Sequence, residues 1–180
     1  MKRMLLIVSM LCLVSFASAQ DLTVSVADTT GAAGSIVEIP VNLEGAADVG
    51  SMGFSLMYDP EVLQAVGVEA GELGTNAYIE SNTANEGEVM VAMADSAGIS
   101  GDGTVAVVSF RVLGEVGSSS SLILADVSVH NTDLVEVISS AVSGTFSVTE
   151  EASQGAGYAN MPVLTISAVV IALFVARRRR

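Results

Sequence analysis

Few combinations of side chains in this 180-residue sequence suggest acid–base or nucleophilic chemistry. His130 is the only histidine, and no second histidine or cysteine accompanies it to hold a metal ion. The acidic pairs Glu86/Glu88 and Glu150/Glu151 fall in turn or linker sequence, where nothing would position a substrate between the carboxylates. The sequence therefore predicts that the protein is not an enzyme, because it lacks a nucleophile–base pair and a cluster of metal ligands.

Asp102 stands between two glycines, so we considered whether it belongs to a calcium-binding loop. The aspartate-rich series and the later glutamate of a calcium-binding loop are absent around it. We therefore expect a plain tight turn at Ser100–Gly103, and no metal ion or other cofactor on this chain.

The stretch Gly50–Pro60 has the pattern of a strand with two different faces. Large and small side chains alternate with a period of two, which predicts one buried and one outward face. The inward set is Met52, Phe54, Leu56 and Tyr58, and the outward set is Ser51, Gly53, Ser55 and Met57. Pro60 ends the strand because it has no N–H to donate. The outward face is neither strongly polar nor apolar enough for a second core, which makes it a candidate recognition surface.

Short strands account for the whole region from residue 20 to residue 150. Turn signals recur roughly every 8–12 residues, and no run shows helical apolar spacing. The nine expected strands are residues 22–26, 36–43, 51–58, 63–68, 77–82, 88–94, 104–113, 122–129 and 142–148. Asp28–Gly31 is interpreted as a turn, and Pro40 requires a sheet edge or a bulge. These features predict an all-β sandwich.

Both ends of the chain have the composition of targeting segments. Residues 1–19 have a basic start, an apolar run and a small-residue cleavage site, which predicts a secretory signal peptide that contains Cys12, the only cysteine. Residues 150–160 form a polar linker, and residues 161–176 are apolar and precede four arginines at 177–180. We expect residues 161–180 to be a C-terminal transmembrane helix that anchors an extracellular domain, or a sorting signal that is removed.

The charge of the central region is strongly negative. All 20 acidic residues lie between Asp21 and Glu151, and Arg111 is the only Lys or Arg there, which gives a net charge of −19. Such a surface would repel phosphates, so we expect no nucleic-acid partner. It should attract basic partners or cations.

Several segments resemble the cohesin family, the β-sandwich modules of cellulosomes and related surface assemblies that bind dockerin domains. They are residues 34–43 with their interior Pro40, 53–63 with Tyr58-Asp59-Pro60, 101–104 with 110–112, 131–136, and 143–148. These segments follow one another in the family's order, and the resemblance as a whole covers about residues 22–149. The resemblance implies a nine-stranded sandwich with jelly-roll topology and no catalytic centre of its own. It also implies that the dockerin lies on the sheet of residues 77–82, 88–94, 51–58 and 122–129, and that the calcium belongs to the dockerin.

The resemblance also assigns candidate partner-binding residues. They are Ser51, Gly53, Ser55, Met57, Tyr78, Glu80, Met90, Ala92, Asp95 and Leu134. Well-known cohesins of the first type have Asn and Asp at the positions of Ser51 and Gly53, so the hydrogen bonds must differ here. Two alternatives stay open: Met90 faces the core if the register slips by one residue, and Leu134 can fold back on the core.

We expect a secreted, monomeric, membrane-anchored module that binds a dockerin-bearing protein and displays it at the cell surface, in a carbohydrate-related or other surface assembly. A structural or adhesive surface domain without a dockerin partner is the main alternative. A carbohydrate-binding module is the weaker one, because sugar rings need exposed aromatic side chains. The sequence has no tryptophan, and of its three tyrosines Tyr58 faces the core and Tyr158 lies in the linker.

Overall fold

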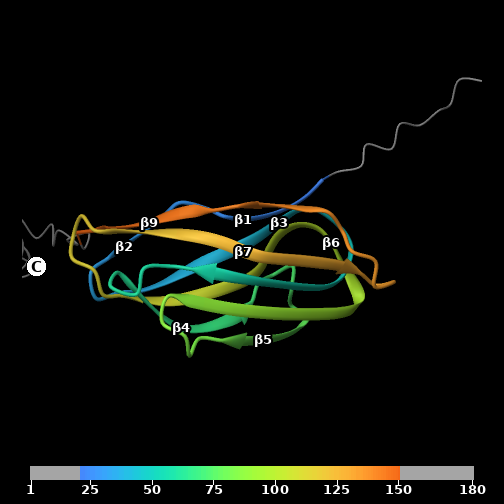
Figure 1. The fold of residues 1–180 in the computed structure, drawn as a ribbon, viewed down its shortest axis with the longest axis horizontal. Coiled ribbons are helices and arrows are strands. Elements are labelled where there is room, and N and C mark those ends of the chain that lie inside the picture. Colours follow the sequence, from blue (N-terminus) through green and yellow to red (C-terminus); the bar gives the residue numbers. More distant parts are fainter. Residues whose placement is uncertain (1–20, 151–180) are drawn as a thin grey trace, which may run out of the picture.

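The computed structural model describes residues 21–150, which form an all-β domain (Figure 1). Its strands are β1 (Leu22–Val26), β2 (Thr29–Ala32), β3 (Ile36–Met57), β4 (Leu63–Ala70), β5 (Tyr78–Asn82), β6 (Glu88–Val112), β7 (Ser119–Asn131), β8 (Ser139–Val142) and β9 (Gly144–Thr149). Within this range no helix is long and apolar enough to span a membrane. The predicted signal peptide, and the predicted tail at residues 161–180, lie outside the described residues.

Two long strands, β3 and β6, organise the sandwich. They pair with each other in antiparallel fashion along most of their length, and each contributes to two sheets. The front sheet consists of β5, residues 88–94 of β6, residues 51–57 of β3 and residues 123–131 of β7. The back sheet consists of β4, residues 104–112 of β6, residues 36–43 of β3, β1 and β8. In Figure 1 the front sheet runs from β5 at the lower edge upward to β7.

The sequence analysis was wrong to divide these two strands into four separate ones. The residues between their halves stay paired, for example Ala46 with Gly101 and Val49 with Ile99, through a series of register shifts. The expected tight turn at Ser100–Gly103 therefore does not form. Glycines with positive φ, including Gly45 at 73° and Gly98 at 79°, allow the paired backbone to bend from one sheet into the other.

The sequence analysis also failed to predict two short strands, β2 and β8. Thr29–Ala32, interpreted as a turn, is β2 and pairs in parallel with β9. Ser139–Val142 is β8 and pairs in parallel with β1, so the expected strand 142–148 begins only at Gly144. Both strands are short and contain no buried residue, so they lack the alternation of buried apolar side chains that identifies a strand in a sequence.

A single core lies between the sheets and confirms the expected inward faces. Met52, Phe54, Leu56 and Tyr58 are at most 9% exposed, and Val89, Val91, Met93, Phe146 and Val148 are buried as well. Tyr58 contacts Phe110 edge-on, with ring centroids 4.9 Å apart, and so joins the end of the front half of β3 to the back half of β6. Pro40 lies just beyond the last β1–β3 pair and next to a register shift, as a proline within a strand requires.

Candidate binding face

The register of the front sheet arranges its outward side chains in four rows, which we call the front face. Each row crosses from β5 or β6 over β3 to β7. In order, the rows are Tyr78–Ala94–Ser51–His130, Glu80–Ala92–Gly53–Ser128, Asn82–Met90–Ser55–Ala125 and Glu88–Met57–Ile123. Of the ten predicted contact residues, eight lie in these rows, and Asp95 and Leu134 do not.

The centre of the front face is built from small residues. Gly53 and Ala92 lie side by side, with Ser51 and Ser128 next to Gly53. A Cβ atom added to Gly53 would meet its nearest atom, the Ser128 Oγ, at 3.5 Å, which is ordinary van der Waals contact. The glycine is therefore not required by packing, and it leaves a flat area where a partner can approach the strand closely.

One end of the front face carries a strip of exposed apolar side chains. Met57, Met90 and Ile123 are 47%, 47% and 46% exposed. Met57 is directly opposite Ile123 and diagonal to Met90, and side chains in such positions contact one another. Met90 is thus outward, and the alternative of a slipped register is wrong. The sequence analysis missed Ile123, although its place between the inward Leu122 and Leu124 was a usable signal.

Ser55 corrects one of the predictions. It lies in the third row, but it is only 4% exposed and cannot form a broad contact with a partner. Its hydroxyl donates a hydrogen bond to Glu88 Oε1 at 2.9 Å. Ser55 therefore orients the Glu88 carboxylate, which lies beside Met57 and was interpreted from the sequence as part of a solvated turn.

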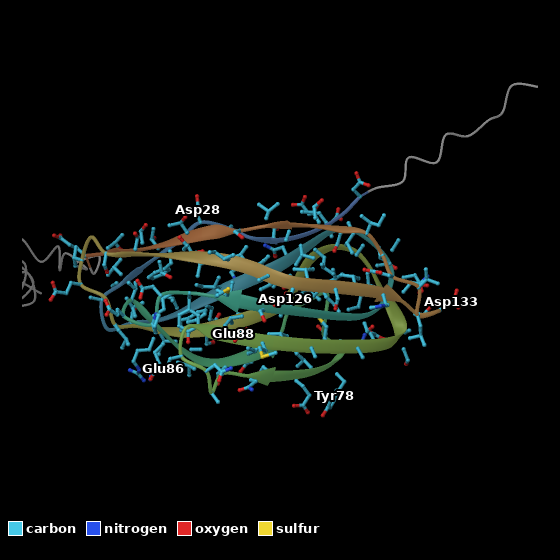
Figure 2. The ribbon with its side chains drawn as sticks, in the orientation of Figure 1. Asp28, Tyr78, Glu86, Glu88, Asp126 and Asp133 are labelled. Atoms are coloured by element: carbon cyan, nitrogen blue, oxygen red, sulfur yellow. The ribbon has the colours of Figure 1, made fainter. Side chains whose placement is uncertain are left out.

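Tyr78 and Glu80 lie on the edge strand β5 and interact with each other. The Tyr78 hydroxyl donates to the Glu80 carboxylate. This hydrogen bond, the negative charge of Glu80 and partial desolvation together raise the pKa of Tyr78 above its ordinary value, because all three favour the neutral phenol. Tyr78 is 69% exposed and projects beyond β5 in Figure 2. It is the only exposed tyrosine among the described residues.

Asp95 and Leu134 lie at the margin of the front face. Asp95 is half-buried, and its carboxylate accepts the backbone N–H of Ala97 at 2.8 Å, so it stabilises the bend of β6. Leu134 is 79% exposed, with a φ of 63°, in the loop after β7. It does not fold back on the core, so that alternative is wrong.

The structure also places the remaining chemical candidates, His130 and Asp102. His130 is half-buried in the first row, opposite Ser51, and its backbone pairs with that of Glu136 in an isolated antiparallel β-bridge. Asp102 accepts the backbone N–H of Gly45 at 2.7 Å and thereby closes the bend between the sheets. Within residues 21–150 no three His, Cys, Asp or Glu side chains are grouped so as to hold a metal ion.

The fold and this face define the class of the protein as an all-β sandwich with an exposed, partly apolar sheet face. More narrowly, the chain belongs to the cohesin family, because the family model of the cohesin domain matches residues 22–148.

Solved structures agree with this assignment. A non-cellulosomal cohesin from the hyperthermophilic archaeon Archaeoglobus fulgidus is 31% identical, with a TM-score of 0.67 over 73% of this chain and 93% of that chain. The sixth cohesin of scaffoldin B from Acetivibrio cellulolyticus, solved with a Cel5 dockerin, is 23% identical, with a TM-score of 0.65 over 72% and 99% of the two chains. The Clostridium thermocellum OlpC cohesin, solved with the dockerin Doc435, is 22% identical, with a TM-score of 0.65 over 73% and 95%. A comparison with curated proteins gives no match.

Proposed function

We propose that this chain is a non-catalytic module that binds a dockerin domain through the front face. The observation that carries the proposal is the exposed strip of Met57, Met90 and Ile123 beside a flat centre of small residues. Exposed methionine suits an adaptable protein contact, and a few central apolar contacts supply most of the affinity of an interface. Family membership supports the choice of partner, since several solved relatives are complexes with dockerins.

The remaining parts of the proposal follow from the sequence. The sandwich is assigned to the jelly-roll class and acts as a monomer. Calcium is bound by the dockerin and not by this chain, and the charge of the central region disfavours nucleic acid. Residues 161–180 hold the module at the outside of the cell, so that it displays its partner in a surface assembly that can be related to carbohydrate breakdown.

A pull-down tests the proposal. Residues 20–150, which contain the whole core, are immobilised and exposed to the extracellular fraction of the source organism, with calcium and with a chelator. Recovery of dockerin-containing proteins only in the presence of calcium supports the proposal. Recovery of polysaccharide would favour a carbohydrate-binding module, and recovery of nothing would favour a structural surface domain.

A further inference from the structure

A hollow on the front face has acidic walls and an apolar floor. It lies over the second and third rows, and Gly53 of β3 and Met90 and Ala92 of β6 are among the residues that line it. Three carboxylates surround it: Glu80 from β5, Glu88 from the start of β6, and Asp126 from β7. Asp126 stands at a register shift with a φ of 51°, so the bulge in β7 places this side chain at the rim of the hollow. Figure 2 shows Glu88 and Asp126 on the front sheet, with Glu88 toward the end of the sheet where β3 finishes.

This chain supplies no positive charge to the hollow from its described residues. Arg111, the only Lys or Arg among residues 21–150, is on the outer side of the back sheet, where it pairs with Ile36 and Gln64. The carboxylates of the front face therefore face solvent without a cation. If a partner covers these carboxylates with apolar or acidic groups, the free-energy cost of desolvating them is not offset by any attraction. A basic side chain of the partner would offset this cost through its charge.

The hollow is also partly organised in advance. The buried hydroxyl of Ser55 holds Glu88 Oε1 at 2.9 Å, while Glu88 itself is half-exposed. Holding the carboxylate in one position lowers the entropy lost when a cation binds to it. Met90 lies two residues beyond Glu88 on the same face of β6, and Met57 is the partner of Glu88 on β3. The exposed surfaces of both methionines can contact the aliphatic stem of a lysine or arginine.

We infer that the partner inserts a lysine or arginine into this hollow, with its charged end between Glu88 and Asp126, and places an aliphatic residue on the strip of Met57, Met90 and Ile123. This inference rests on the proposed function, and it specifies the chemistry of the dockerin surface that this chain selects. The acidic walls disfavour dockerins with an acidic or neutral residue at that position.

The test uses the dockerin domain of the recovered protein and four variants of this chain. Glu88→Gln and Asp126→Asn keep the shape of each side chain and remove its charge. We expect each to weaken binding about tenfold at low salt, chiefly through faster dissociation. Ser55→Ala leaves the charge of Glu88 but frees its side chain, and we expect a loss of about threefold. Glu86→Gln is the matched control, because Glu86 is an exposed glutamate two residues away, in the turn before β6, and does not line the hollow.

The outcomes of this test distinguish a failure of the inference about the hollow from a failure of the proposed dockerin binding. The inference is supported if Glu88→Gln and Asp126→Asn lose affinity, if Glu86→Gln stays within twofold, and if the difference shrinks in 1 M salt. Replacing the dockerin lysines and arginines one at a time by methionine should then identify one position whose effect is not additive with Glu88→Gln. If both hollow variants bind within twofold of the unmodified chain, the inference is wrong while dockerin binding stands. If no dockerin is recovered, the proposed function fails before any variant is made.

Discussion

The two outer faces of the sandwich are made by the same two strands, yet they differ in the side chains that they expose. On the front face, β3 and β6 present Ser51, Gly53, Met57, Met90 and Ala92. On the back sheet the same strands present alternating polar and apolar residues, namely Ile36, Glu38, Pro40, Asn42, Thr104, Val107, Ser109 and Arg111. Some of these satisfy each other, as when the Thr104 hydroxyl donates to Asn42 Oδ1 at 2.8 Å.

The difference lies in arrangement and not in the number of exposed apolar side chains. Ile36 is 51% exposed and Met57 is 47% exposed, so either could be buried by a partner. Met57 lies next to two other exposed apolar side chains, Met90 and Ile123, whereas Ile36 is paired with the charged Arg111. Single exposed apolar residues are normal on protein surfaces, but a continuous group next to a flat centre indicates an interface.

The strongest test of this comparison places one charge at each end of β3. Met57→Arg should weaken dockerin binding at least about a hundredfold, or ~2.7 kcal/mol, because a bulky charged group replaces an apolar contact in the strip of Met57, Met90 and Ile123. Ile36→Arg, the matched variant on the back sheet, should bind within about twofold of the unmodified chain. Binding is measured by calorimetry, and unfolding temperatures should stay close to that of the unmodified chain for both. Equal losses of affinity would show that the two faces do not differ in function.

Substitutions of Gly71 and Gly53 by alanine test whether the back sheet is more tightly packed around its glycine than the front face is. A Cβ atom on Gly71, at the end of β4, would lie 2.3 Å from the Thr104 carbonyl oxygen, whereas one on Gly53 meets nothing closer than 3.5 Å. We expect Gly71→Ala to lower the free energy of unfolding by about 2 kcal/mol or more through overpacking. Gly53→Ala should leave it unchanged or raise it by up to ~1 kcal/mol, because alanine loses less conformational entropy. Denaturant unfolding measures both, and a destabilised Gly53→Ala would mean that the front centre is more tightly packed than its geometry indicates.

The smallest expected effect concerns the edge of the front sheet. The hydrogen bond from Tyr78 to Glu80 raises the pKa of the Tyr78 phenol. The stabilisation that this hydrogen bond gives to the folded state is therefore present below the ordinary tyrosine pKa, and it is lost as the pH rises through the raised value. Glu80→Gln should lower the pKa of Tyr78 toward the ordinary range, since both the charge and the strongest acceptor are removed. Spectrophotometric titration of the tyrosines measures this shift. An unchanged titration curve would show that the pair does not form in solution.

Much of this architecture could be predicted from local patterns. The alternation in residues 52–58 and 88–94 identified inward and outward faces correctly, because a strand with one buried face leaves a period-two signal. The bends in β3 and β6 could not be predicted, because glycines and short polar residues look the same in a hairpin turn and in a bulged strand. The strands β2 and β8 left no detectable pattern for a different reason, because neither has an alternation of buried apolar side chains.

The front face was predictable only in part. Outward positions on β3 and β6 followed from alternation, but Ser128 and Asp126 became part of the face only through the pairing of β7, including its bulge. The role of Ser55 also depends on a contact between residues distant in sequence, the hydrogen bond to Glu88. Such contacts are determined by register, which a single sequence does not specify.

The bulged bend that joins the two sheets has a consequence for how such modules can diversify. In a regular strand, one inserted residue moves every later side chain to the opposite face. Here the pairing of β3 with β6 already shifts register at several points between Val41 and Ser51, so an insertion or deletion in this bend can be absorbed as another bulge. The front half can therefore accept a new residue sequence, or even a new length, while the back half keeps its alignment. Evolution or protein engineering can change the partner of this domain without designing its core again.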